Sequence, residues 1–232
     1  MTTENSKKNP SIKPLVILPA AGFGSRVGFP EAKELILGPS GEPLITLALN
    51  QARLRKWPVH VITRKEKKSL IEFLEYYSDR NQMEIGIQII DPSQEWPETV
   101  LQSQEVWHDK NLLCLPDTEF EPVEIWDRLI ENLQGDVDVA MAVFESQDYG
   151  SWGVVRSLPD GRLEICEKPQ GNQERPLQKE NIQAWGLSAF TKRGGVELLS
   201  VQLKSTFDHS WVGLRAQARL FKLAQFRDLT RG

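Results

Sequence analysis

The amino-acid sequence predicts an α/β fold with a Rossmann-like, mostly parallel central sheet flanked by helices, and with an antiparallel hairpin extension. Apolar runs of strand length alternate with segments of roughly 3.6-residue periodicity through the first part of the chain. That order is typical of right-handed crossovers between parallel strands that helices bury on both faces. After Tyr149 the alternation stops, and two short apolar runs flank an Asp-Gly turn.

In the first part, each apolar run is bounded by residues that break strands. The runs "PLVILPA", "PVHVIT", "EIGIQII", "NLLCLPD" and "DVAMAVFE" predict strands at residues 14–20, 58–63, 84–90, 111–117 and 138–145. Apolar side chains at helical spacing predict helices at 43–54, 65–77, 97–107 and 122–133. Strand and helix therefore alternate from residue 14 onwards.

The second part begins with "WGVVRSLPDGRLEICEK", in which Asp160 and Gly161 supply a hairpin turn. A loop at 169–181, rich in Gln, Asn and Pro, precedes the strand "AWGLSAF" and a helix at 192–203. The run "RLFKLAQF" predicts a last strand at 219–226. Because neither a linker nor an internal repeat separates the two parts, we expect one domain, residues 1–232, with a flexible polar leader at 1–13.

Composition excludes several classes of function. The net charge is −4, from 28 basic and 32 acidic residues, so no global positive field would hold a nucleic acid. Nowhere do about 18 apolar residues run together, as a membrane span requires. Cys114 and Cys166 are too few for a disulfide framework or a four-thiolate zinc site, and they fit a reducing cytoplasm.

The stretch "LVILPAAGFGSRVGFPEAKELIL" carries the strongest functional signal. A loop after the first parallel strand lies at the carboxyl edge of the sheet, where ligands bind in such folds. Gly22 and Gly24 let main-chain amides approach phosphate oxygens, and Ser25 adds a hydroxyl donor. Arg26 offers a planar fork for phosphate, while Lys33 places a compact charge against a reacting phosphoryl group. The spacing matches neither common glycine fingerprint, and a flexible turn with solvated charges is the alternative.

The segment "AAGFGSRVGFPEAKEL", followed by "GEPLI", resembles the opening signature of the sugar nucleotidyltransferases, also called nucleotide-diphosphate-sugar pyrophosphorylases. The resemblance implies the nucleotide-diphospho-sugar transferase fold, with a nucleotide-binding half at 14–145 and a sugar-binding half at 146–232. The Pro-Lys or Ser-Lys of the family is Ala32-Lys33 in this chain.

The same resemblance implies roles for the residues of this segment. Arg26 would steady the leaving pyrophosphate, and Lys33 would stabilise charge at the α-phosphate, so both are expected to be catalytic. The nucleotide-binding residues would be Ala20, Ala21, Gly22, Gly24 and Ser25.

The resemblance also implies a magnesium site, formed by acidic residues at two strand ends. Asp117 follows the apolar run of "LLCLPDTEFEP", and Mg²⁺ takes one or two protein carboxylates together with waters and substrate oxygens. In the family a Gly-Asp strand end supplies a metal ligand, and here Pro116 replaces that glycine. "FRDLTRG" resembles the family's Trp-x-Asp-Ile-Gly-Thr, so Asp228 would be the second ligand, with Thr230 in place of glycine. A turn-capping role for Asp117, and Asp208 as a rival second ligand, stay open.

The hairpin carries a third matching region. "YGSWGVV" and "EKP" resemble the sugar pocket of the family, which implies that Gly153, Glu167 and Lys168 bind the sugar phosphate. A carboxylate accepts hydrogen bonds from two hydroxyls, and a lysine neutralises a phosphate monoester. An exposed edge hairpin with alternating charges is the alternative.

Together these segments occur in family order over nearly the whole chain. They predict a cytoplasmic nucleotidyltransferase that uses Mg²⁺, joins a sugar 1-phosphate or a similar phosphate monoester to a nucleoside triphosphate, and releases pyrophosphate. The substrates would be its partners, without nucleic acid or membrane, and a homo-oligomer is compatible with the sequence. Two residue groups are expected to be structural: "RKEKKS" as a solvated helix start, and Trp152, Trp185 and Trp211 as core or pocket wall.

One region departs from the family pattern. After "IQIIDPSQ", Trp96-Pro97-Glu98-Thr99 replace the Gly-Thr-Ala or Gly-Leu-Ala loop that reads the nucleotide base. A missing glycine blocks close main-chain approach. Two alternatives therefore remain: a nucleotide-binding or regulatory relative without turnover, and a related-fold glycosyltransferase whose "DTE" stands near an Asp-x-Asp metal motif.

Overall fold

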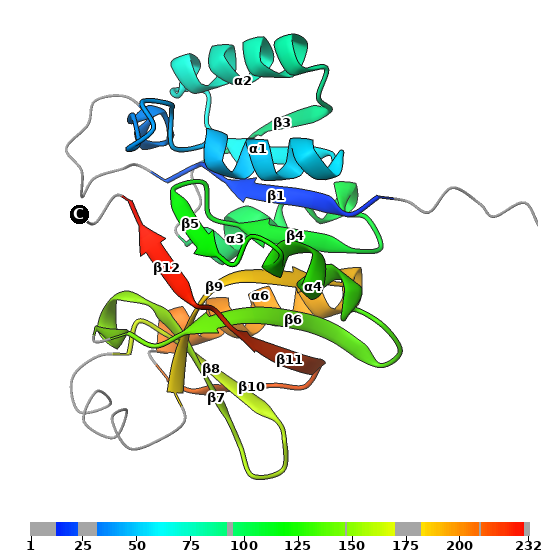
Figure 1. The fold of residues 1–232 in the computed structure, drawn as a ribbon. Coiled ribbons are helices and arrows are strands. Elements are labelled where there is room, and N and C mark those ends of the chain that lie inside the picture. The colour runs from blue at the N-terminus through cyan, green and yellow to red at the C-terminus, as the bar shows by residue number, and fades with distance from the viewer. Residues whose placement is uncertain are drawn as a thin grey trace, which may run out of the picture.

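A central sheet with helices on both faces forms the body of the computed structural model (Figure 1). The structure describes residues 13–22, 32–91, 95–146, 148–169, 182–208 and 210–229. Among these residues ten strands share the main sheet, and β12 and β5 form a separate pair. The predicted α/β fold is confirmed.

The elements have the following bounds. The strands are β1 (Leu15–Pro19), β2 (Val59–Thr63), β3 (Ile85–Ile89), β4 (Asn111–Cys114), β5 (Thr118–Glu121), β6 (Val137–Phe144), β7 (Gly153–Ser157), β8 (Leu163–Glu167), β9 (Ile182–Phe190), β10 (Val212–Leu214), β11 (Gln217–Lys222) and β12 (Gln225–Asp228). The helices are α1 (Thr46–Arg55), α2 (Lys68–Asn81), α3 (Trp96–Leu101), α4 (Ile125–Glu131) and α6 (Lys192–Asp208), with 3₁₀ turns η1 (Lys33–Leu35), η2 (Gln104–Val106) and η3 (Tyr149–Ser151).

The parallel part of the sheet has the order β4-β1-β2-β3. Strand β9 joins it to the second part, because β9 pairs antiparallel with β4, β6 and β7. Strands β7 and β8 form the predicted antiparallel hairpin, and β10 extends it. Helices α1, α2 and α4 cover one face of the sheet, whereas α3 and α6 cover the other.

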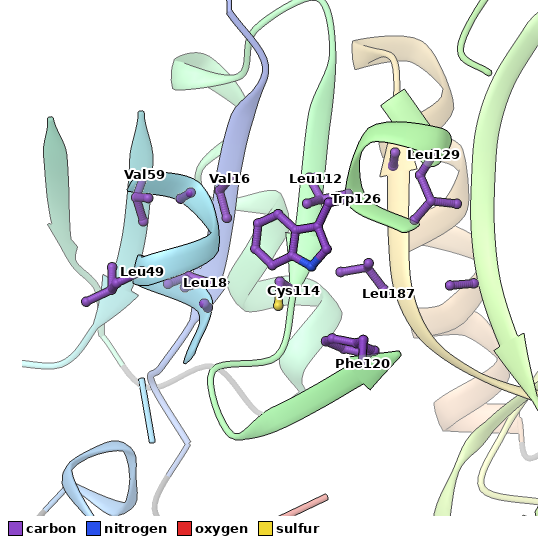
Figure 2. Packing of buried hydrophobic residues seen from close by; sticks show 14 of the residues in the cluster. Val16, Leu18, Leu49, Val59, Leu112, Cys114, Phe120, Trp126, Leu129 and Leu187 are labelled. Atoms are coloured by element: carbon purple, nitrogen blue, oxygen red, sulfur yellow. The ribbon is translucent and has the colours of Figure 1, made fainter. Parts of the chain in front are cut away.

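Successive apolar side chains of β1 are buried on opposite faces of the sheet, as expected for a central strand. Val16 and Leu18 belong to the apolar cluster beneath α1 and α4, while Leu15 and Ile17 belong to the cluster beneath α3 and α6. The first cluster is filled by the indole of Trp126 from α4 (Figure 2). Full burial of each such apolar side chain contributes about 1.5–3 kcal/mol, so an apolar run in this position specifies a central strand.

Two segments differ from the prediction in ways that matter for the site. The expected last strand at 219–226 is divided between β11, which pairs with β6, and β12, which pairs with β5. The division falls where Leu223 N donates to Val143 O and Ala224 N donates to Glu121 O, so the chain leaves one partner strand for the other.

The second difference is a shorter helix where 97–107 was expected. Helix α3 ends at Leu101, and a 3₁₀ turn follows. Ser103 Oγ donates to Val100 O at 2.7 Å, which is the kind of local bond that competes with continued helix. No helix in the described part of the chain has the length and apolar character to cross a bilayer.

Candidate active site

Three neighbouring strands end at one edge of the sheet. Because β4, β1 and β2 are parallel, the residues that follow them meet at their carboxyl ends. Asp117 follows β4, and Lys67 lies in the turn between β2 and α2. Ala20, Ala21 and Gly22 follow β1, as predicted for the start of the glycine-rich stretch.

Lys33 and Asp117 form an ion pair at this edge. Lys33 Nζ donates to Asp117 Oδ2 at 2.6 Å. The Asp117 side chain is 7% exposed and that of Lys33 is 25% exposed, so the carboxylate is largely withdrawn from water while the ammonium group keeps access to it. The two residues for which the sequence predicts metal binding and phosphate stabilisation therefore lie in contact.

Main-chain bonds fix η1, which carries Lys33. Leu44 N donates to Ile36 O at 2.9 Å, and Ile45 N donates to Glu34 O at 3.0 Å. Gly41 permits the turn between these segments, because its φ of +77° is one that glycine adopts without strain. The "AKEL" and "GEPLI" pieces of the signature thus pair with each other, immediately before α1.

The described nucleotide-binding candidates are positioned by the end of β1. Ala20 N donates to Ile62 O at 2.8 Å, which continues the β1–β2 pairing for one residue beyond the strand. Gly22 has open space where a Cβ would stand. Three further candidates, Gly24, Ser25 and Arg26, lie outside the described residues.

Strand β12 brings the second predicted metal ligand beside the first. Asp228 pairs with Thr118, the residue after Asp117, and Leu229 N donates to Asp117 O at 3.1 Å. Figure 1 shows β12 lying alongside β5. Asp208, the rival, is exposed at the end of α6, which packs against β8 and β10.

Aromatic packing holds β12 in this position. The Phe226 ring stacks on Phe144 with centroids 4.0 Å apart and meets Phe120 at 5.4 Å and Trp152 at 5.0 Å. A Cβ on Gly186 of β9 would stand 2.3 Å from the Phe226 ring, so glycine at that position admits the ring. Phe226, two residues before Asp228, therefore fixes the position of the Asp228 backbone.

The donor set at this edge fits Mg²⁺. Asp117 contributes a largely buried carboxylate, the backbone of Asp228 lies on the neighbouring strand β12, and oxygen ligands are those that Mg²⁺ prefers. Among the described residues, no three His, Cys, Asp or Glu side chains form a metal-binding group. A site with one or two carboxylates suits an ion that takes its remaining ligands from phosphate oxygens and water.

The sugar-phosphate candidates come together at the open end of the β7–β8 hairpin. Gly153 is the cross-strand partner of Glu167. Lys168 N donates to Trp152 O at 3.0 Å, and Lys168 has a positive φ of 46°, which directs the chain away from the strand. Since Trp152 contacts Phe226, this end of the hairpin adjoins the base of β12.

Glu167 is a buried carboxyl group with unusual surroundings. It is 4% exposed, and burial raises its pKa to about 7, while the charge of Lys168 and the indoles of Trp185 and Trp96 act in the opposite direction. Within the described part of the chain, Glu167 Oε1 and Trp185 Nε1 have no hydrogen bond of acceptable geometry. Both atoms lie within 2.5 Å of the place where a Cβ on Gly153 would stand, so the glycine makes room for them.

Sequence reasoning missed two features of this region. Trp96, from the segment that replaces the base-reading loop, packs on Trp185 with ring centroids 5.6 Å apart. Lys67 was expected to be solvated within "RKEKKS", and that expectation is wrong: the side chain is 7% exposed and binds Glu34. The apolar residues on either side of "RKEKKS" gave no signal of this contact, because charged runs usually face water.

No protein-family model matches the sequence, and no curated protein sequence matches it. Solved structures match it over most of its length. A protein from Bacillus anthracis assigned as glucose-1-phosphate thymidylyltransferase, in complex with sucrose, gives a TM-score of 0.72 at 16% identity, covering 94% of this chain and 90% of that chain.

Two further solved structures are of proteins named for other nucleotides or acceptors. A UTP-bound UGPase from Acinetobacter baumannii gives a TM-score of 0.66 at 15% identity, covering 94% of this chain and 89% of that chain. The inositol-1-phosphate CTP transferase from T. maritima gives 0.65 at 13% identity, covering 91% and 86%. The chain therefore has the fold of the sugar nucleotidyltransferases, as its opening signature predicts.

Proposed function

We propose that the protein transfers a nucleotidyl group from a nucleoside triphosphate to a sugar 1-phosphate, or to a similar phosphate monoester, and releases pyrophosphate. The observation that carries the proposal is the convergence of Lys33, Asp117 and the strand of Asp228 at the carboxyl ends of β1 and β4. The proposed active unit has its nucleotide half at 14–145 and its acceptor half at 146–232. Cys114 and Cys166 are buried thiols that are not joined in a disulfide, in keeping with a reducing cytoplasm.

In the proposed reaction, an oxygen of the acceptor phosphate attacks the α-phosphorus in line. A new P–O bond forms, and the bond from the α-phosphorus to the bridging oxygen breaks, so that its electron pair leaves with pyrophosphate. No general base is needed, because the phosphate nucleophile is already ionised. Catalysis then consists of positioning and charge neutralisation.

Each candidate residue has a role in that step. Gly22 and Gly24 cradle the nucleotide, together with Ala20, Ala21 and Ser25, and Arg26 steadies the leaving pyrophosphate. Lys33 exchanges the Asp117 carboxylate for the α-phosphate when the nucleotide binds, and there it stabilises the charge of the transition state. The ion pair keeps its ammonium group within reach of that position beforehand.

Asp117 and Asp228 are the residues that would hold Mg²⁺. The ion, when bound, would supply a divalent charge that neutralises phosphate oxygens. On the acceptor side, Gly153, Glu167 and Lys168 bind the sugar phosphate, with the Glu167 carboxyl group accepting hydroxyl donors and Lys168 neutralising phosphate.

A second candidate function is nucleotide binding without turnover. It is favoured by Trp185, whose indole nitrogen lies 2.2 Å from the position of a Cβ on Gly153 and so occupies the space above that glycine. Trp96 closes the same region from α3. An acceptor pocket filled by the protein's own side chains would bind nucleotide and leave it intact.

One assay separates the two functions. Nucleoside triphosphates are incubated with Mg²⁺ and a panel of sugar 1-phosphates, choline phosphate and inositol 1-phosphate, and pyrophosphate is measured. Pyrophosphate that depends on one acceptor supports the transferase. Nucleotide binding by calorimetry, without pyrophosphate from any acceptor in the panel, supports the binding function.

A further inference from the structure

The turn between β2 and α2 contains a buried lysine, Lys67. Lys67 Nζ donates to both carboxylate oxygens of Glu34, at 2.9 and 2.8 Å, and to Ala20 O at 2.7 Å. The three donors of one ammonium group are thereby all used. Glu34 is fully buried, and burial lowers the pKa of Lys67 against the opposing effect of Glu34. Because a buried ion pair is stable only when its polar atoms are hydrogen-bonded, Lys67 and Glu34 depend on all three of these bonds.

The partners of Lys67 stand at the two ends of the signature stretch. Ala20 is the first residue after β1, and Glu34 is the residue after Lys33. Ala20 is fixed on its other side by Ile62 O, and the Glu34 carbonyl is fixed by Ile45 N. Lys67 therefore ties the Ala20 main chain to the side chain of Glu34, fourteen positions further along the chain, and both residues border the proposed nucleotide site.

The position of Lys33 depends on this arrangement. Lys33 and Glu34 share the single turn of η1. The buried Glu34 side chain fixes this turn to Lys67, while the Lys33 side chain binds Asp117. Lys33 and Lys67 both lie at this edge of the sheet, where each pairs with a carboxylate, Asp117 and Glu34 respectively.

We infer that Lys67 is a positioning residue that clamps Ala20 to Glu34 and so holds Lys33 in place for the nucleotide, without touching the reacting atoms. The inference rests on the proposed function for its kinetic readout. If the clamp operates, loss of Lys67 displaces Lys33, and displacement of a positioned charge by about 1 Å is enough to reduce rate by about 10²-fold.

Lys67→Met is the first variant. We expect kcat to fall by about 10-fold or more, the affinity for the Mg²⁺–nucleotide complex to weaken, and the KM for the acceptor phosphate to stay the same. Lys68→Met is the matched control, because Lys68 is the adjacent lysine and is exposed. It should retain wild-type kinetics.

A double variant distinguishes positioning from a purely structural role. Lys67→Met/Glu34→Met replaces the buried ion pair with apolar side chains, and such replacements commonly recover stability. The Ala20 carbonyl still lacks its donor, and η1 still lacks its anchor. We therefore expect the urea midpoint to return towards wild type while nucleotide affinity and kcat remain impaired. Recovery of stability and kinetics together would overturn the inference, and this comparison holds even where Lys67→Met alone does not fold.

Hydrogen exchange separates failure of the clamp from failure of the proposed function. In the double variant, the peptide covering residues 32–38 should exchange faster than in wild type, and in Lys68→Met it should not. This result is independent of turnover. Absence of pyrophosphate release from wild type would contradict the proposed function, whereas unchanged exchange at 32–38 in the double variant would contradict the clamp.

Discussion

Lys33 Nζ lies 2.6 Å from Asp117 Oδ2, although 84 residues separate the two in the chain. The contact holds η1, the last turn of the signature stretch, against the segment that follows β4. It joins a cation suited to a phosphoryl group with a carboxylate suited to a divalent ion. The proposed chemistry depends on both groups serving one triphosphate.

Replacement of Asp117 by asparagine tests the carboxylate. We expect kcat/KM for the nucleotide to fall by about 10²-fold or more, because the variant loses the proposed metal ligand and the negative charge that pairs with Lys33. The measurement is pyrophosphate release as a function of Mg²⁺ concentration.

Glu119→Gln is the control for Asp117→Asn. The Glu119 side chain is 43% exposed, and Glu119 lies in β5 two residues after Asp117. Its activity should match wild type. Equal losses in the two variants would instead favour an Asp-x-Glu metal motif, as in the glycosyltransferase alternative.

Phe226 tests whether aromatic packing locates Asp228. Phe226→Ala removes the stack on Phe144 and the edge contacts with Phe120 and Trp152. We expect the free energy of unfolding to fall by about 2–4 kcal/mol and the Mg²⁺ requirement for activity to shift to higher concentration. Phe207→Ala, at a phenylalanine that is 57% exposed, should change neither quantity. Unfolding by urea and a Mg²⁺ titration of activity are the measurements, and an unchanged Mg²⁺ requirement in a destabilised Phe226→Ala would contradict the anchor.

Gly153 and Trp185 form a pair for a double-mutant cycle. Gly153→Ala should destabilise the protein by about 1–3 kcal/mol, because the new Cβ would stand 2.2 Å from Trp185 Nε1 and 2.5 Å from Glu167 Oε1. Trp185→Phe removes the nearer of these atoms, so Gly153→Ala should do less damage in that background. Strict additivity of the two substitutions in urea unfolding would argue against the contact.

The Glu167 carboxyl group predicts a pH dependence of stability. Its pKa is raised to about 7 in the folded protein from a reference value of 4.5, so the folded state binds more protons than the unfolded state between those pH values. Stability should therefore fall as the pH rises through this window, by at most about 3 kcal/mol from this group. Glu167→Gln should remove that fall, leaving the variant more stable relative to wild type at pH 8 than at pH 4. Identical pH profiles in urea unfolding would contradict the prediction.

Much of the fold follows from sequence pattern. Apolar runs such as Val16 to Leu18 identify the central strands, because a strand buried on both faces requires apolar side chains on both faces. The juxtaposition of Asp117 with the Asp228 strand could be anticipated only from family order. Strand β5 has a mixed burial pattern, so its sequence predicts a strand only weakly. Strands β11 and β12 form one apolar run in the sequence but pair with different strands, β6 and β5.

The supporting contacts could not be predicted in the same way. Lys67 lies in a charged run that resembles a solvated face, and its burial is set by Glu34 and Ala20, which are distant in sequence. Trp96 at the start of α3 contacts Trp185 of β9, and no spacing in the chain encodes that contact. Charge pairing and aromatic contact across elements are tertiary properties, whereas periodicity is local.

The most direct measurement of the central claim follows the α-phosphorus itself. Nucleoside triphosphate labelled at the α-phosphate with ³²P is incubated with Mg²⁺ and each acceptor phosphate, and transfer of label to the acceptor is measured for wild type and for Lys33→Ala. We expect acceptor-dependent transfer by wild type and a loss of about 10²-fold or more in the variant. Transfer at the wild-type rate by Lys33→Ala would contradict the account.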